Sequence, residues 1–307
     1  MKRVIPTVDV SQFLGGNEAE KAEFVKELGT AFSSVGFVGI INHGVAQTLI
    51  DDFYTAAKAF FALPRAVKNQ YEIPELAGQR GFTSFGKEHA KHTDVADLKE
   101  FYQLGQAKVI PNVEVVELPE FVQLGIELYQ SFETAGAALL QAIALYLNLP
   151  EDYFDAKIEE GSSILRAIHY PPITKEPESA IRAEQHEDIN LITLLVGASA
   201  GGLQLLNKQD EWLSVIPEAN EIVVNVGDML QRLTNNYLRS TTHRVVNPPR
   251  EMWHLPRLSI PFFLHPRAEM DLTSLPNCIT EDRPLAYEPI TAGDYLDERL
   301  REIGLKK

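Results

Sequence analysis

The stretch that decides the fold reads His186-Glu187-Asp188-Ile189-Asn190-Leu191-Ile192-Thr193-Leu194-Leu195-Val196. Its second half is apolar and of strand length, and we expect strands over residues 184–188 and 191–196. Side chains two positions apart lie on one face of a strand. The imidazole of His186 and the carboxylate of Asp188 are therefore predicted to project side by side, with Glu187 turned away.

Two later segments add matching chemistry. His243 lies 55 positions after Asp188, in a predicted strand, and Arg257 and Ser259 begin another. Two imidazoles and one carboxylate form the facial triad of non-haem Fe(II) oxygenases, which leaves one face of the metal open. Arg257 and Ser259, again two positions apart, are predicted to hold a carboxylate through a charged fork and a hydroxyl. Taken alone, His186 fits equally a hydrogen-bonded strand histidine, and Arg257 fits a salt bridge.

The chain from Ser162 onward has the texture of a β-protein. Short runs rich in β-branched and aromatic residues alternate with Pro, Gly and Asn, and we expect strands at 163–170, 184–188, 191–196, 203–206, 221–226, 241–246 and 257–264. Many short strands without long helices between them favour a double-stranded β-helix, the jelly-roll or cupin-like architecture. Asp228 opens a short predicted helix, and we interpret it as the helix N-cap and not as a ligand.

The first half of the chain reads as mostly helical. Asn17 and Glu20 form a predicted capping box for a helix that ends near Ser34, and further helices are expected over 46–62 and 119–147. A short strand is expected over 36–42, and we expect the long third helix to lie along the outside of the sheet. The predicted fold class is α+β, mostly β, with N-terminal and supporting α-helices. We expect one catalytic unit over 1–307, comprising a mainly helical region with a substrate-side loop (1–118), supporting helices (119–160), the jelly-roll core (161–268) and a C-terminal tail with a helix (269–307).

Composition narrows the class of partner. The 307 residues carry a net charge of −15 without a Lys/Arg block, which argues against a nucleic-acid or anionic membrane surface. Cys278 is the only cysteine, so no intramolecular disulfide is possible, which fits a reducing compartment. No apolar run approaches the roughly 18 residues of a membrane span. We expect a cytoplasmic monomer or weak homo-oligomer.

The order of these motifs resembles the isopenicillin N synthase-like family of 2-oxoglutarate- and Fe(II)-dependent oxygenases. That family shows His-x-Asp, a distal histidine some fifty residues later, and then Arg-x-Ser. The likeness runs from about residue 5 to 265 and includes Ile5-Pro6-Thr7-Val8-Asp9, Gly36-Phe37-Val38, Asn42-His43-Gly44-Val45 and Leu165-Arg166-Ala167-Ile168-His169-Tyr170-Pro171-Pro172. It implies an Fe(II) held by His186, Asp188 and His243, dioxygen, and a 2-oxoglutarate whose distal carboxylate meets Arg257, Ser259 and Tyr170.

The resemblance implies oxidation of a small-molecule substrate, most often hydroxylation, with release of succinate and CO2. One alternative is an Fe(II) and dioxygen oxidase of the isopenicillin N synthase or ethylene-forming type, which does not use 2-oxoglutarate. Isopenicillin N synthases carry a C-terminal glutamine near the metal, and this chain has none after Gln231. The other alternative is a non-catalytic cupin-like binding protein, which would need neither the triad nor the anion fork.

The substrate side is less marked in the sequence. The loop 79–89 combines aromatic and cationic residues, and we hypothesise that Arg80, Phe82 and Lys87 bind a small, anionic substrate. A solvated loop with core phenylalanines is the alternative. Phe263 fits a pocket wall and a core position equally. Plant members of the family carry Asn two positions before the pocket tyrosine, whereas Ile168 here makes the wall more apolar.

Overall fold

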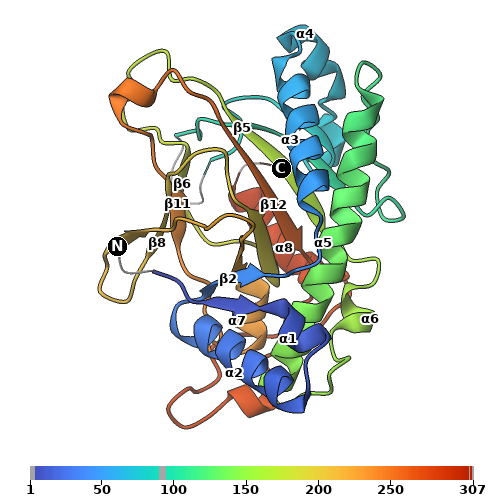
Figure 1. Cartoon of the computed structure of the whole chain (residues 1–307), viewed down its shortest axis with the longest axis vertical. Coiled ribbons are helices and arrows are strands. Elements are labelled where there is room, and N and C mark those ends of the chain that lie inside the picture. The colour runs from blue at the N-terminus through green and yellow to red at the C-terminus, as the bar shows by residue number, and fades with distance from the viewer. Residues whose placement is uncertain (1–3, 90–94, 304, 306–307) are drawn as a thin grey trace.

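The computed structural model describes residues 4–89, 95–303 and 305. Within them, the strands form two sheets, an eight-stranded one in the order β1-β2-β10-β7-β12-β5-β4-β3 and a four-stranded one in the order β6-β11-β8-β9. This is the jelly-roll fold that the strand pattern predicted, with the small sheet facing one side of the large one (Figure 1). The strands are β1 (Thr7–Asp9), β2 (Phe37–Ile41), β3 (Gly81–Thr83), β4 (Glu100–Gly105), β5 (Ile164–Tyr170), β6 (Ala183–His186), β7 (Ile192–Val196), β8 (Leu203–Leu206), β9 (Trp212–Ser214), β10 (Ile222–Val226), β11 (His243–Val245) and β12 (Arg257–Leu264).

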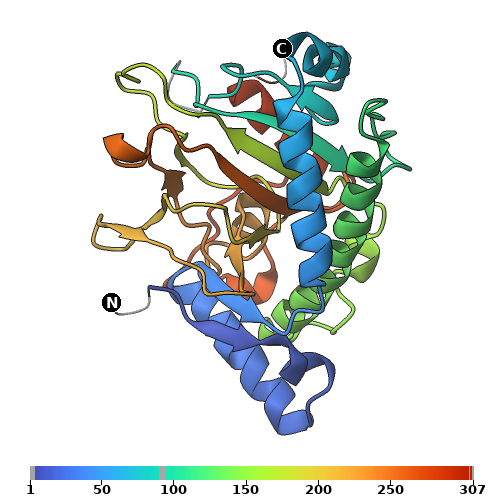
Figure 2. The ribbon, with the colours of Figure 1, turned by 45° about the horizontal axis from the view of Figure 1, so that its top comes forward.

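The long helices α3 and α5 cover the other side of the large sheet (Figure 2). Asn17 caps α2 with the predicted capping box, because its side chain accepts from the backbone of Glu20 while the Glu20 carboxylate accepts from Asn17. The three long predicted helices are confirmed with ends within a residue or two. The helices are α1 (Val10–Leu14), α2 (Glu18–Ser34), α3 (Gln47–Ala62), α4 (Arg65–Lys68), α5 (Pro119–Tyr146), α6 (Asp155–Ile158), α7 (Asp228–Leu233) and α8 (Ala292–Glu302).

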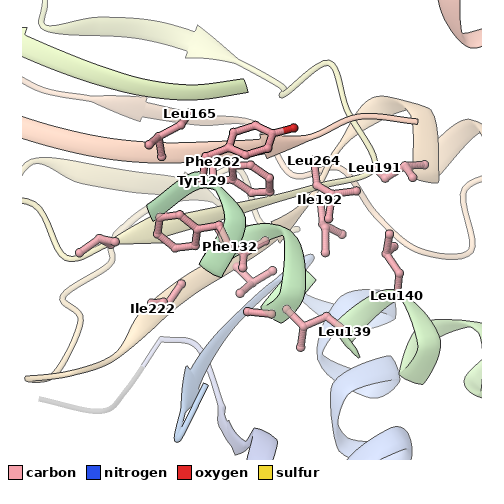
Figure 3. Packing of buried hydrophobic residues seen from close by; sticks show 14 of the residues in the cluster. Tyr129, Phe132, Leu139, Leu140, Leu165, Leu191, Ile192, Ile222, Phe262 and Leu264 are labelled. Atoms are coloured by element: carbon pink, nitrogen blue, oxygen red, sulfur yellow. The ribbon is translucent and has the colours of Figure 1, made fainter. Parts of the chain in front are cut away.

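Strand β12 shows how the large sheet separates the core from the site. Successive side chains point to opposite faces. The even-numbered residues enter the hydrophobic core, and the Phe262 ring lies 5.5 Å from Phe132 and 5.2 Å from Tyr129 of α5 (Figure 3). The odd-numbered residues line a cavity on the opposite face, namely Arg257, Ser259, Pro261 and Phe263. A shift of one residue in register would exchange the two sets.

Three details differ from the sequence-based expectations. The region 1–118 contains more helix than strand, as expected, but it contributes four strands, β1, β2, β3 and β4, to the large sheet, where only one was expected. Strand β6 ends at His186, so Asp188 follows the strand instead of lying in it. Asp228 is the first residue of α7 and not its cap, since Gly227 occupies the cap position. No helix in the described part of the chain is long and apolar enough to cross a membrane.

Candidate active site

The two predicted histidine ligands are direct neighbours across the small sheet. His243 of β11 pairs with His186 of β6, and their ring centroids lie 4.4 Å apart. Asp188 enters from the turn between β6 and β7, with Oδ1 at 3.8 Å from His186 Nε2 and 3.7 Å from His243 Nε2. One ligand atom from each residue lies within 4.8 Å of the others, which is close enough for all three to bind one ion. The structure therefore brings the predicted triad together.

Contacts behind the triad fix which atoms face the ion. The Nδ1 atoms of His186 and His243 lie 2.7 and 3.1 Å from the carbonyl oxygens of Glu184 and Thr241, so each Nδ1–H donates to backbone and each Nε2 keeps its lone pair. Asp188 Oδ2 accepts from Thr193 Oγ1 at 2.6 Å and from Asn225 Nδ2 at 2.8 Å, which leaves Oδ1 for a metal.

The charges are set for metal binding near neutral pH. Burial, with the nearby His243, lowers the pKa of His186 and keeps its imidazole neutral. Burial opposes ionisation of Asp188, but His243 and His186 together with the two hydrogen bonds to Oδ2 lower its pKa. Two neutral imidazoles and a carboxylate with an open side match the donor set of Fe(II) oxygenases. The residues present fit an Fe(II) ion.

The predicted anion fork lies in the same cavity. Arg257 pairs directly with Tyr170 across β12 and β5, and its guanidinium carbon lies 4.9 Å from the tyrosine ring centroid. Ser259 is one step further along the inward face, beside Ile168. Arg257 is 2 % exposed, donates Nε to the Ala200 carbonyl and leaves Nη1 without an acceptor. Among the described residues it has no carboxylate partner, so the salt-bridge alternative for Arg257 is not realised.

The cavity that joins triad and fork has a volume of about 550 Å³. Its wall near the triad includes apolar side chains: Phe37 packs edge-on against His243, and Ile168 lines the same cavity. Phe263, one of the predicted substrate residues, lines the cavity. This volume suits a small molecule together with a dicarboxylate co-substrate.

The other three predicted substrate residues lie outside the cavity wall. Arg80 is 2 % exposed, and its guanidinium donates to the carbonyl oxygens of Gln79, Gln106 and Ile110. Phe82 packs in the core against Phe60. Lys87 is half exposed and pairs with Glu72 at 2.7 Å. The alternative of a solvated loop with core phenylalanines thus describes their placement, and none of the three lines the cavity.

A buried charge cluster in the wall was missed by the sequence reasoning. Glu88 accepts from Lys99 at 2.6 Å and from Arg166 at 3.1 Å, while Lys99 also pairs with Asp97 at 2.8 Å. Burial opposes this charge on Glu88, yet Arg166 and Lys99 lower its pKa to about 2. Two acids and two bases cancel, so the cluster is polar without net charge. The only sequence signal was the Arg166 position within the Leu165–Pro172 strand motif, because Arg166 and its partner Glu88 lie 78 positions apart.

The C-terminal helix was also missed as part of the site. Leu296, Leu300 and Ile303 of the α8 region line the same cavity. Asp228 also lines this cavity, and burial together with the neighbouring Glu187 raises its pKa to about 8. The Glu187 carboxylate accepts a hydrogen bond from the Thr242 hydroxyl at 3.0 Å. Glu187 and Asp228 are not part of the ligand cluster in the described residues.

Comparisons with known proteins agree with this geometry. Residues 5–120 match the family model described as non-haem dioxygenase in morphine synthesis N-terminal, and residues 161–266 match that of the 2OG-Fe(II) oxygenase superfamily. A 2OG-Fe(II) oxygenase family protein from Caulobacter crescentus superposes with a TM-score of 0.87 at 42% identity, covering 98% of this chain and 100% of that one.

Two further relatives carry more specific names. T7H of Neurospora crassa, solved in complex with alpha-KG (2-oxoglutarate), has a TM-score of 0.87 at 31% identity, over 97% of this chain and 96% of that one. The proline hydroxylase buaE of Petromyces alliaceus is 32% identical over 314 residues, which cover 96% of this chain and 98% of that protein. Full-length similarity at this level, with a matching metal triad, shows that the chain belongs to the isopenicillin N synthase-like family of 2-oxoglutarate- and Fe(II)-dependent oxygenases.

Proposed function

We propose that the chain hydroxylates a small molecule, with Fe(II) held by His186, Asp188 and His243 and the distal carboxylate of 2-oxoglutarate held by Arg257, Ser259 and Tyr170. The observation that carries the proposal is one cavity that contains both a metal triad and a buried guanidinium without a carboxylate partner in the described residues. Unlike Arg80, whose guanidinium is satisfied by carbonyl oxygens, Arg257 keeps a buried Nη1 without an acceptor, and an uncompensated buried charge costs several kcal/mol. The distal carboxylate of the co-substrate supplies the compensating anion.

Each residue has a separate task in this mechanism. Bound Fe(II) would supply the centre where dioxygen is reduced while 2-oxoglutarate is decarboxylated to succinate and CO2. The Nε2 atoms of His186 and His243 and Oδ1 of Asp188 would hold the ion on one side and leave its other side to the co-substrates. Ile168 and Phe263 would keep water away from the reacting substrate.

For the substrate we propose a small polar molecule. The same cavity is also lined by charged and amide groups, those of Glu88, Asp97, Lys99, Arg166 and Gln103. Relatives named a proline hydroxylase and a T7H solved with thymine act on or bind molecules of this size. A neutral polar cluster favours a substrate with both donors and acceptors over a simple anion, in contrast to the anionic substrate considered from the loop 79–89.

We also propose a cytoplasmic location and a monomeric or weakly associating state. The support is the single cysteine, which is buried and free, and the strongly negative net charge. Fractionation of cells and sedimentation of the purified protein test these two points directly.

The proposal is tested by adding 2-oxoglutarate to the Fe(II) protein without oxygen and recording the visible metal-to-ligand charge-transfer band. Oxygen is then admitted and succinate is assayed. We expect the band and succinate from the unaltered protein, neither from His186→Ala, and both from His254→Ala, a matched change at an exposed histidine. Absence of both signals in the unaltered protein would overturn the proposal. Oxygen uptake without succinate would instead support the oxidase alternative.

A further inference from the structure

A second arginine lies behind the co-substrate site. Arg182 immediately precedes β6 and is 2 % exposed. Its guanidinium carbon lies 5.9 Å from the Tyr170 ring centroid, and that of Arg257 lies 4.9 Å from the same centroid. Two buried guanidinium groups therefore share one tyrosine ring, whose hydroxyl belongs to the proposed carboxylate site.

Neither cation is neutralised by the protein. In the ranges that the structure describes, Arg182 and Arg257 form no ion pair. Each donates a hydrogen bond to a carbonyl oxygen at 3.0 Å, Arg182 to that of Leu255 and Arg257 to that of Ala200. Arg182 Nε and Arg257 Nη1 are buried without an acceptor. By comparison, the buried Lys99 in the cavity wall contacts two carboxylates. The pair is thus an uncompensated positive region inside the fold.

The two charges also act on each other. Burial first, and the charge of Arg257 second, lower the pKa of Arg182 to about 10, so Arg182 remains protonated at neutral pH. Two like charges in a poorly solvated region repel each other. An anion bound close to both guanidinium groups would offset this repulsion. Arg257 alone could donate two hydrogen bonds to one carboxylate. The second cation, Arg182, therefore needs a separate explanation.

We propose that Arg182 is a positioning residue for the co-substrate: its charge adds to that of Arg257 at the distal-carboxylate site, and its contact with Tyr170 holds the phenol ring there. This rests on the proposed function. It follows that the pocket selects 2-oxo acids that end in a second carboxylate over 2-oxo acids with an uncharged end.

The test uses Arg182→Gln and Arg182→Lys in the anaerobic Fe(II) protein, with 2-oxoglutarate titrated by calorimetry. For Arg182→Gln we expect a dissociation constant raised about tenfold, the order expected for loss of one unit charge in a shielded pocket. Binding of 2-oxobutyrate, which lacks the second carboxylate, should change little. Arg182→Lys should recover part of the affinity, and KM for 2-oxoglutarate should rise while kcat at saturation stays close to its original value.

Arg232→Gln is the matched control. Arg232 likewise lies over tyrosine rings, donates to one carbonyl and has a buried Nε without an acceptor, but its rings are those of Tyr287 and Tyr295 and not that of Tyr170. We expect it to lower thermal stability and leave 2-oxoglutarate affinity unchanged. Equal affinities in Arg182→Gln and unaltered protein, or equal losses for 2-oxoglutarate and 2-oxobutyrate, would overturn the inference. The proposed function would stand in both cases, since its failure appears as absent 2-oxoglutarate binding in the unaltered protein.

Discussion

Replacing Thr193 with valine isolates one hydrogen bond to the proposed iron-binding carboxylate. Thr193 Oγ1 donates to Asp188 Oδ2 at 2.6 Å and accepts from Asn190 Nδ2 at 2.8 Å. Valine has nearly the same shape, so the site keeps its packing, but Asp188 retains only the hydrogen bond from Asn225. The change therefore weakens the hold on the carboxylate without removing a metal ligand.

The magnitude follows from the contacts. A hydrogen bond to a charged group contributes about 1.5–3 kcal/mol, and each 1.4 kcal/mol is a factor of ten. Fe(II) affinity should therefore fall by about 10- to 100-fold, which agrees with the general effect of losing a group that orients a metal ligand. The unpaired Asn190 amide should in addition destabilise the metal-free protein by about 1–3 kcal/mol.

The assay is an anaerobic Fe(II) titration against a competing chelator, with circular dichroism of the metal-free protein to verify folding. Thr193→Ser keeps the hydroxyl and should keep most of the affinity. Thr134→Val removes an exposed hydroxyl of α5 that donates to the Gln130 carbonyl, and it should leave affinity unchanged. If Thr193→Val binds Fe(II) within twofold of the unaltered protein, the assigned role of this hydrogen bond is refuted.

Three further results are expected. Arg257→Gln should raise KM for 2-oxoglutarate by at least about 100-fold, measured by succinate release, because it removes a buried charge from the carboxylate site; an unchanged KM would contradict the assignment. Burial lowers the pKa of His265 from 6.5 to about 4, so the native state binds fewer protons than the unfolded state between these pH values. This histidine therefore removes about 3 kcal/mol from the free energy of unfolding as the pH falls from 6.5 to 4. In urea titrations, His265→Gln should make the free energy of unfolding depend less on pH over that range. Phe132→Ala should cost about 3–5 kcal/mol by opening a cavity between α5 and Phe262, seen as a lower urea midpoint; a shift below 1 kcal/mol would contradict this packing.

The parts of the fold that the sequence predicted are those fixed by local chemistry. The capping box at Asn17 is satisfied within four residues, and the alternation along β12 follows from its own side chains. The site motifs could be recognised in the sequence because they are short. His-x-Asp and Arg-x-Ser each place two groups two positions apart, and the distal histidine is a single residue. The prediction that they share a cavity is confirmed by the geometry.

The missed parts depend on distant partners. Strand β4 contains Glu100 and Gln103, which do not look like buried strand residues, and they are buried because Lys68 pairs with Glu100 and Arg166 with Gln103. Arg80 resembled a ligand in an aromatic loop, but backbone carbonyls more than twenty positions away bind its guanidinium. Such compensation is invisible until the chain is folded.

The position of Asp188 explains why the two sheets act as one site. The small sheet sets the two imidazoles as a cross-strand pair, and the large sheet carries Arg257. Asp188 lies in the turn between β6 of one sheet and β7 of the other, and its Oδ2 is held by Thr193 and Asn225, which are themselves direct neighbours across β7 and β10. The large sheet thus positions the carboxylate as well as the guanidinium, so a change in sheet packing would alter metal binding and anion binding together.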